Sequence, residues 1–350
     1  MTVPPGDPTN KGGAPTDADS EDLILFESSE MLEDSSTDAT SRKKRGIPRR
    51  IETAPSLERP VLLEADSDVG SEDFRAPEPP MSRPEMARDL DFEDSRLWPI
   101  RAMSEIEDQE RFVVEGELAV ERLLRARPRW HVESLVGTRP RLRRLAPLLD
   151  DRTVCYEASH QELQDLTGFK FHRGILATAR REWDRFDATE RALLAGSNEV
   201  RILVAHGIAD PANLGAVIRN SRAFGINVIY IDANAADPLS RKAIRASAGN
   251  IFSAAFRRYT DLATTCQTLR DHFRATCIAT SLRPQAVRLP LRRAPKRWAL
   301  IVGNEGDGLP ESALGAADVE LTIPLAKDVD SLNVGAATAV VLFALTSSPT

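Results

Sequence analysis

The sequence predicts an α/β protein whose carboxy-terminal part is built on a mostly parallel sheet. From residue 200 onward, short apolar runs alternate with stretches of helical periodicity. The runs are apolar throughout, as in strands that are buried on both faces. Three of them are followed by segments rich in Gly, Asn and charge. Because ligands bind at the carboxyl ends of parallel strands, we expect a functional site at that edge.

We expect residues 1–99 to form a disordered acidic leader. They hold 23 Asp and Glu against 12 Lys and Arg, with few apolar residues. Such a segment cannot bury enough apolar surface to offset its ordering entropy. The basic cluster at 42–45 is either a patch that targets or touches RNA, or a charged stretch of solvated tail, and we favour the second. Removal of residues 1–95 is therefore expected to leave the fold intact.

Residues 100–180 are predicted to form a small α/β domain, because short apolar runs and helical stretches alternate there. Strands are expected at 111–114, 132–136 and 174–179, and helices at 116–127, 141–149 and 161–166. The polar residues 181–199 then form a linker.

Residues 200–350 are predicted to form the larger domain. Its strands are expected at 202–205, 228–231, 251–256, 277–280, 298–302 and 319–323, and its helices at 213–224, 238–246, 262–273 and 333–345. The alternation matches a sheet with helices on its faces.

Composition excludes several classes of protein. The three cysteines form no CxxC pair and the five histidines have no ligand spacing, so we expect neither a disulfide framework nor a metal site. The longest apolar run, 339–345, is too short to span a membrane. The amino terminus lacks a secretory signal, so a cytoplasmic location is expected. Outside the leader, 34 basic side chains face 30 acidic ones, which permits a polyanionic partner.

The first candidate segment is HGIADPANLGAVIRNSR at 206–222. Pro211 fixes a turn, and Asn213 is placed to cap the following helix through its side-chain oxygen. Arg219 and Arg222 lie three residues apart, away from the apolar stripe of that helix. The alternative is an ordinary capped amphipathic helix whose arginines are solvated.

Two further segments also follow predicted strands. IVGNEGDGLP at 301–310 has three glycines in six residues, which indicates a tight turn or close approach to a ligand. IPLAKDVDSLNVGAATA at 323–339 ends a strand and starts a helix at Ser331 or Asn333. Small residues in that helix permit another backbone to pack closely. The alternatives are a solvated loop and tight internal packing, and neither segment matches a dinucleotide fingerprint or a P-loop.

Together, in this order and spacing, the three segments resemble the signature motifs of the SpoU/TrmH family of RNA ribose 2′-O-methyltransferases. The resemblance covers residues 200–346, with Gly335 where many members have Ser. FVVEG at 112–116 and LTGFKFHRGILA at 166–177 resemble the opening and closing strands of the family's L30e-like RNA-binding domain. The resemblance implies a SPOUT-type trefoil knot in the sheet domain, S-adenosylmethionine as cofactor, and a homodimer formed through the knot region.

The resemblance also implies roles for individual residues. The cofactor would be held by backbone groups at Thr280, Gly303, Ile323, Leu325 and Leu332. Asn213, Glu305, Ser331 and Asn333 would act in catalysis by ordering the site and contacting the incoming nucleotide. Arg219 matches the catalytic arginine, which either activates the hydroxyl or, since a guanidinium hardly loses its proton, grips phosphate and stabilises the forming alkoxide. The phosphate-binding candidates are Arg141, Arg144, Lys170, Arg173 and Arg222.

We therefore expect a methyltransferase acting on a ribose 2′-hydroxyl of structured RNA, most simply 23S-type ribosomal RNA. A tRNA methyltransferase is the alternative within the class. A catalytically silent RNA-binding protein is the alternative outside it, although intact Asn213, Arg219, Glu305 and Asn333 argue against that. A nicotinamide-dependent enzyme would need a glycine fingerprint that is absent after the first strand.

Overall fold

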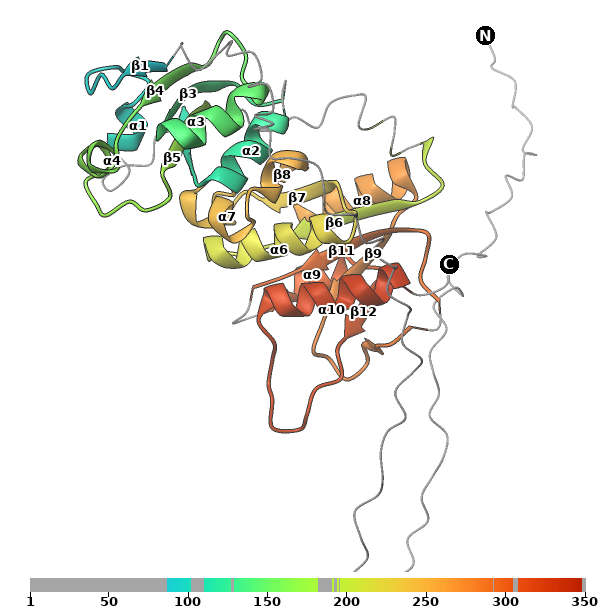
Figure 1. The fold of residues 1–350 in the computed structure, drawn as a ribbon. Coiled ribbons are helices and arrows are strands. Elements are labelled where there is room, and N and C mark those ends of the chain that lie inside the picture. Colours follow the sequence, from blue (N-terminus) through green and yellow to red (C-terminus); the bar gives the residue numbers. More distant parts are fainter. Residues whose placement is uncertain are drawn as a thin grey trace, which may run out of the picture. The chain divides into compact units, whose positions relative to one another are not determined.

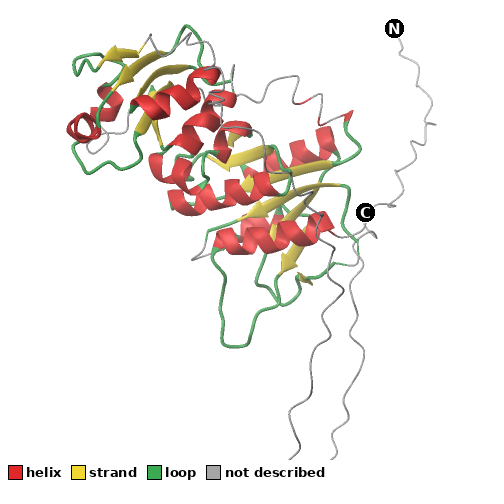
Figure 2. Ribbon diagram, viewed as in Figure 1, coloured by secondary structure: helices red, strands yellow, loops and turns green. Residues whose placement is uncertain are grey.

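The computed structural model describes residues 87–101, 110–126, 129–181, 191, 194, 196–291, 293–304 and 308–347 (Figure 1). The basic cluster at 42–45, most of the predicted leader and most of the predicted linker lie outside these residues. Two sheets organise the described part of the chain (Figure 2).

The smaller sheet has five strands in the order β1-β4-β3-β5-β2. The strands are β1 (Ala87–Asp89), β2 (Arg111–Glu115), β3 (Val132–Gly137), β4 (Val154–Glu157) and β5 (Ile175–Arg180). β5 pairs antiparallel with β2 and β3, while β4 pairs parallel with β1 and β3. Its helices are α1 (Trp98–Arg101), α2 (Glu117–Arg125), α3 (Arg139–Leu145) and α4 (His160–Thr167).

Local signals in the sequence explain where these helices begin and end. The Ser159 hydroxyl accepts from the Glu162 amide, and the Glu162 carboxylate accepts from the Ser159 amide, which forms a capping box at the start of α4. Gly168 then ends α4 in the left-handed conformation. At the start of α3, Pro140 supplies a fixed φ where no amide donor is needed.

The small domain begins earlier than the sequence predicted. β1 pairs with β4, and Leu97 and Ile100 are fully buried beneath the sheet. The Asp94 carboxylate accepts from the Arg96 guanidinium at 2.8 Å and from the Tyr156 hydroxyl. The bond from Arg96 lowers the pKa of Asp94, and burial raises the pKa of Tyr156 to about 12. Residues 87–99 therefore do not belong to the leader, and an ordered segment was missed because its apolar residues are few.

The larger sheet has seven strands in the order β10-β12-β9-β11-β6-β7-β8, and every neighbouring pair is parallel. This confirms the mostly parallel sheet predicted from the apolar runs. The strands are β6 (Val200–Ala205), β7 (Val228–Asp232), β8 (Ala255–Tyr259), β9 (Thr276–Thr280), β10 (Val287–Arg288), β11 (Arg297–Val302) and β12 (Val319–Thr322).

Helices cover both faces of this sheet (Figure 1). They are α6 (Pro211–Ala223), α7 (Arg241–Ala246), α8 (Leu262–Phe273), α9 (Glu311–Gly315) and α10 (Val334–Ser347). Alternate residues of β6 pack into the core under α6 and α10 and into the core under α8 and α9. Such two-sided burial is why the runs 202–205, 228–231 and 298–302 are apolar at successive positions.

Two parts of the larger domain differ from prediction. The segment 251–256 was expected to be one strand, but Asn250–Ser253 is a 3₁₀ helix and the strand begins at Ala255. Left-handed Gly249 turns the chain into that helix, and a short apolar run cannot reveal such a change by periodicity. The short elements β10 and α9 were also missed.

The small domain packs against the larger one through an aromatic cluster. Phe112, Trp130 and Phe252 have ring centroids 5.5–5.9 Å apart, and the Trp130 indole donates to the Phe252 carbonyl at 3.0 Å. The Arg122 guanidinium donates to the Ala248 carbonyl at 2.6 Å. Among the described residues, no helix is long and apolar enough to cross a lipid bilayer.

Removal of residues 1–95 should lower the melting temperature, contrary to the expectation from sequence, because it deletes β1 and the Asp94 contacts. A loss of about 2 kcal/mol corresponds to about 4–8 °C in a protein of this size. Removal of residues 1–82, which keeps β1, is the control. Equal melting temperatures of the two truncated proteins in scanning calorimetry would contradict a structural role for residues 87–95.

Candidate functional site

A cavity of about 600 Å³ lies at the carboxyl ends of β9, β11 and β12. It falls in the range of about 300–1,000 Å³ that is usual for small-molecule sites. All five residues expected to hold the cofactor line it: Thr280, Gly303, Ile323, Leu325 and Leu332. The structure thus brings together residues that lie up to 52 positions apart in the sequence. They meet because each follows the carboxyl end of one of three parallel strands.

The lining of this cavity is divided into apolar and polar parts. Leu309, Leu314 and Leu321 give it an apolar wall, while Asp330 and Ser331 add polar groups. A flat apolar ring system with polar substituents would suit such a lining. Ser331, one of the residues predicted to order the site, therefore lies at the cavity, whereas Glu305 lies outside the described residues.

Gly303 allows the chain to pass very close to the neighbouring turn. A Cβ at this position would lie 2.8 Å from two side-chain atoms of Leu309 and 2.9 Å from the carbonyl carbon of Gly308. Real Cβ atoms essentially never approach other atoms so closely, so any side chain here would displace the backbone of the loop. Glycine at 303 therefore fixes the shape of the cavity floor.

Asn213 and Asn333 join the first and third segments. The Asn333 amide nitrogen donates to the Asn213 side-chain oxygen at 3.0 Å. The Asn333 oxygen accepts from the amides of Gly335 at 3.0 Å and Ala336 at 3.3 Å, and so caps α10. Two turns of α6 further on, Asn220 donates to the Gly335 carbonyl at 2.7 Å. These contacts fix α6 against α10 directly beside the loop that lines the cavity.

The predicted cap of α6 was wrong. Asp210, not Asn213, caps this helix, because its carboxylate accepts from the amides of Ala212 at 2.6 Å and Asn213 at 3.2 Å. Lys242 also donates to Asp210 at 2.7 Å and lowers the pKa of that carboxyl. Asp210 frees the Asn213 side chain to reach Asn333.

The two predicted arginines of α6 have different surroundings. Arg219 is exposed, and its guanidinium has no hydrogen-bond or ion-pair partner among the described residues. Arg222 instead donates to the Ser253 hydroxyl at 3.1 Å and to the Ile226 carbonyl at 3.2 Å. Burial lowers the pKa of Arg222. Protein acceptors therefore occupy the Arg222 guanidinium, whereas Arg219 can bind an external anion.

The remaining phosphate-binding candidates lie in the small domain. Arg141 and Arg144 both donate to Glu117, with 2.8 Å for the Arg144–Glu117 pair. Arg173 and Lys170 lie in the loop between α4 and β5 and are exposed. These four residues are far from the cavity in sequence, and the structure assigns none of them to its lining.

A polar cluster at the ends of three adjacent strands was missed in the sequence. His206 follows β6, Asp232 ends β7 and Tyr259 ends β8. The His206 Nδ1 and the Tyr259 hydroxyl lie 2.9 Å apart, and Asp232 accepts from the Gly207 amide at 3.2 Å. Burial raises the pKa of Tyr259. The available signal was that each residue terminates a neighbouring parallel strand.

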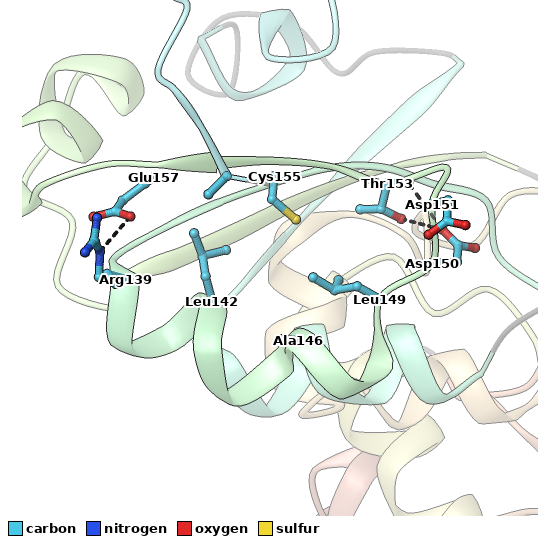
Figure 3. A pocket seen from close by; sticks show the side chains of 10 residues that line it. Arg139, Leu142, Ala146, Leu149, Asp150, Asp151, Thr153, Cys155 and Glu157 are labelled. Atoms are coloured by element: carbon cyan, nitrogen blue, oxygen red, sulfur yellow. Dashed lines mark hydrogen bonds and ion pairs between the residues drawn. The ribbon is translucent and has the colours of Figure 1, made fainter. Parts of the chain in front are cut away.

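A second, smaller cavity lies in the small domain under α3 (Figure 3). Its volume is about 40 Å³, far below that of a cofactor site. Arg139 at its mouth is paired with Glu157 at 2.9 Å, and Thr153 donates to Asp150 at 3.1 Å. Within the described ranges, no three His, Cys, Asp or Glu side chains are grouped to hold a metal ion.

Comparison with known proteins gives consistent results. Residues 201–343 match the model of the SpoU rRNA Methylase family. A Mycobacterium bovis protein named as an uncharacterized tRNA/rRNA methyltransferase is 35% identical over 244 residues, which cover 67% of this chain and 81% of that protein. The 23S rRNA (guanosine-2′-O-)-methyltransferase RlmB of Escherichia coli (strain K12) is 28% identical over 237 residues, covering 66% and 96%.

The fold is also found among solved structures. An AdoMet-bound rRNA methyltransferase from Sinorhizobium meliloti matches with a TM-score of 0.59 and 22% identity, covering 74% of this chain and 97% of that one. The match includes more of the chain than residues 201–343 alone, so the similarity in fold extends into the small domain.

Replacing Asn333 tests its structural role at the start of α10. Asn333→Ala removes the cap and the bond to Asn213, and should lower the free energy of unfolding by about 1–2 kcal/mol. Asn333→Asp keeps the acceptor for the two amides, and the Asn213 amide can turn to donate to the new carboxylate, so its loss should stay below about 0.5 kcal/mol. Urea unfolding measures both, with exposed Asn227→Ala as control. Equal losses in the two variants would contradict the cap.

Proposed function

The chain belongs to the SpoU rRNA methylase family, and on this premise we propose that it transfers the methyl group of S-adenosylmethionine to a ribose 2′-hydroxyl of ribosomal RNA. One observation carries the proposal most directly. The residues at the ends of β9, β11 and β12 line a single cavity of cofactor size, and Asn333 links the rim of that cavity to the helix that bears Arg219. The RlmB relative, whose name states this activity, supports the choice of substrate.

The chemistry of the cavity fits S-adenosylmethionine. Leu309, Leu314 and Leu321 would contact the adenine, and the polar groups of Asp330 and Ser331 would face the ribose and the amino acid part. Backbone groups at the predicted cofactor positions would complete the site, and the close turn at Gly303 leaves room for the ligand. Bound there, the cofactor supplies an electrophilic methyl group on a sulfonium. The S. meliloti fold relative was solved with AdoMet bound, which supports this assignment.

The protein's own contribution is mainly to position the two reactants. Arg219 has a permanently charged guanidinium that cannot serve as a base at ordinary pH. We propose that it binds the phosphate next to the target ribose and stabilises the negative charge that develops on the 2′-oxygen. The contact between Asn213 and Asn333 holds α6, which carries Arg219, against the start of α10 beside the cavity. The 2′-hydroxyl proton leaves to solvent.

The finer architecture follows from the same premise. We propose that the loops 303–310 and 323–333 form the trefoil knot, and that the five-stranded domain is L30e-like and binds the substrate. A homodimer is supported by an apolar stripe on α10, where exposed Ala336, Val340 and Phe343 recur at helical spacing. Phe343 is 62% exposed, which is unusual for a large aromatic side chain in a helix of a monomer.

Transfer of tritiated methyl from S-adenosylmethionine to total RNA tests the proposed reaction. The RNA should come from a strain that lacks this gene. The wild-type protein should label it, Arg219→Ala should be at least about 100-fold slower, and Arg219→Lys should fall between them. Digestion should return 2′-O-methylnucleosides from ribosomal RNA.

Two other outcomes would redirect the proposal. Label confined to tRNA would favour the tRNA alternative, which the name of the M. bovis relative keeps open. Cofactor binding without any labelling would favour a silent RNA-binding protein. All three proteins should bind the cofactor equally well in calorimetry, because Arg219 is not part of the cavity lining.

Gly303→Ala should weaken binding of S-adenosylmethionine at least about tenfold, because the added methyl group forces the loop to move. Gly315→Ala is the matched control, since a Cβ there has no heavy atom within 4 Å. Isothermal titration calorimetry measures both dissociation constants. Unchanged affinity in Gly303→Ala would contradict the placement of the cofactor against this turn.

A further inference from the structure

A second large cavity, of about 390 Å³, lies where β2 ends and α2 begins. Arginines from three separate segments line it: Arg141 from α3, Arg173 from the loop before β5, and Arg245 from α7 of the larger domain. This cavity shares no lining residue with the cavity at the ends of β9, β11 and β12. Arg219 does not line it either. Its function is therefore not explained by the methyl-transfer site.

Positive charge exceeds negative charge around this cavity. Glu115 is buried and pairs with Arg241 at 3.4 Å and Arg245 at 3.3 Å. Glu117 pairs with Arg141 and Arg144. Two carboxylates thus face four paired arginines, and Arg173 adds a fifth cation. Each guanidinium has five N–H donors, so these carboxylates leave many donors unused.

Arg173 is held in the cavity without an acidic partner among the described residues. Its guanidinium lies 3.3 Å from the position that a Cβ on Gly116 would occupy. Gly116 has a φ of +90°, which a residue with a side chain rarely adopts. The glycine therefore both makes the sharp turn from β2 into α2 and leaves space for the guanidinium. An exposed cation that has no acidic partner in the described part of the chain, and that lines a concave site, suits an anionic ligand.

An aromatic side chain beside these arginines favours one class of anionic ligand. Phe169 is 37% exposed, and the Arg241 guanidinium lies 5.2 Å from the centre of its ring. Exposed aromatic rings beside arginines are typical of surfaces that stack unpaired RNA bases. Arginine forks also match the geometry of phosphate. An acidic peptide would satisfy the charge but would not use the ring.

We propose that this cavity binds backbone phosphates of the RNA substrate, and that the small domain and α7 hold one RNA strand between them. The proposal rests on the proposed function for the identity of the polyanion. Phosphate contacts orient a substrate without reading its sequence. Arg173 and Arg245 are therefore positioning residues that place the target ribose, and buried Glu115 fixes the directions of Arg241 and Arg245.

The test compares Arg173→Ala/Arg245→Ala with the wild type in binding protein-free ribosomal RNA over a range of salt concentrations. Each phosphate contact on a single strand contributes about 0.7 to the slope of log K against log salt. The double variant should lower that slope by about 1.4 and weaken RNA binding about tenfold or more at low salt. In the methylation assay its KM for RNA should rise while kcat stays close to wild type.

Three variants serve as controls. Arg173→Lys/Arg245→Lys keeps both charges and should retain the wild-type slope. Arg152→Ala removes an exposed arginine elsewhere in the small domain and should change nothing. Glu117→Gln removes a competing negative charge and should tighten RNA binding two- to fivefold, which an unfolded variant could not do. All should bind S-adenosylmethionine with the wild-type dissociation constant.

An unchanged salt slope in the double alanine variant, with the wild type binding RNA, would overturn the phosphate site. Weaker RNA binding in Glu117→Gln would do the same. If the double alanine variant fails to fold, the RNA affinities of Arg173→Lys/Arg245→Lys and Glu117→Gln alone test the phosphate site. If the wild type binds RNA with the expected slope but labels none, the methyltransferase proposal fails while the phosphate site stands.

Discussion

The close packing of α6 between α7 and α10 is the constraint on which the site depends. A Cβ on Gly215 of α6 would lie 2.5 Å from the carbonyl oxygen of Ala243 in α7. A Cβ on Gly335 of α10 would lie 2.9 Å from the Cβ of Ala216 in α6. Both contacts are closer than any side chain allows. The two glycines therefore let α6 approach both helices at backbone distance. The hydrogen bonds that Asn213 accepts from Asn333 and that Asn220 donates to Gly335 then fix its register. A larger side chain at position 335 would meet Ala216.

The sheet could be predicted well because its physical signal is strong. Strands buried on both faces must be apolar at every position, and the runs ending at Ala205, Ile231 and Val302 are. The prediction of individual elements failed where that signal is weak. The run 251–256 is equally apolar in its 3₁₀ half and its strand half, and the two-residue strand β10 has no periodicity to detect. β1 was missed because an edge strand of three partly exposed residues resembles the polar leader before it.

The residues that line the cavity could be predicted, but the contacts of their neighbours could not. Spacing alone left each of the three segments open to an ordinary structural explanation, and the family resemblance selected the residues that line the cavity. Neither source could show which side chain caps α6, because Asp210 and Asn213 are equally good caps by residue type. Nor could they show that protein acceptors occupy the Arg222 guanidinium while Arg219 has no partner among the residues that the structure describes. The acceptors of Arg222 come from Ser253, 31 positions away, and from the turn at Ile226.

Methyl transfer to a hydroxyl places a demand on geometry more than on acid–base strength, and the arrangement of these residues meets that demand. Asn333 caps α10, contacts α6 through Asn213, and directly follows Ser331 and Leu332 at the cavity. One residue thus couples the position of the cofactor-lining loop to the position of the helix that carries Arg219. Arg219 lies six residues along α6 from Asn213, about 9 Å along the helix axis. A displacement of either helix would change the distance between the reacting groups, and a shift of about 1 Å can cost about 100-fold in rate. Tight helix packing by small residues therefore fixes α6, which carries Arg219, relative to the loop that lines the cavity.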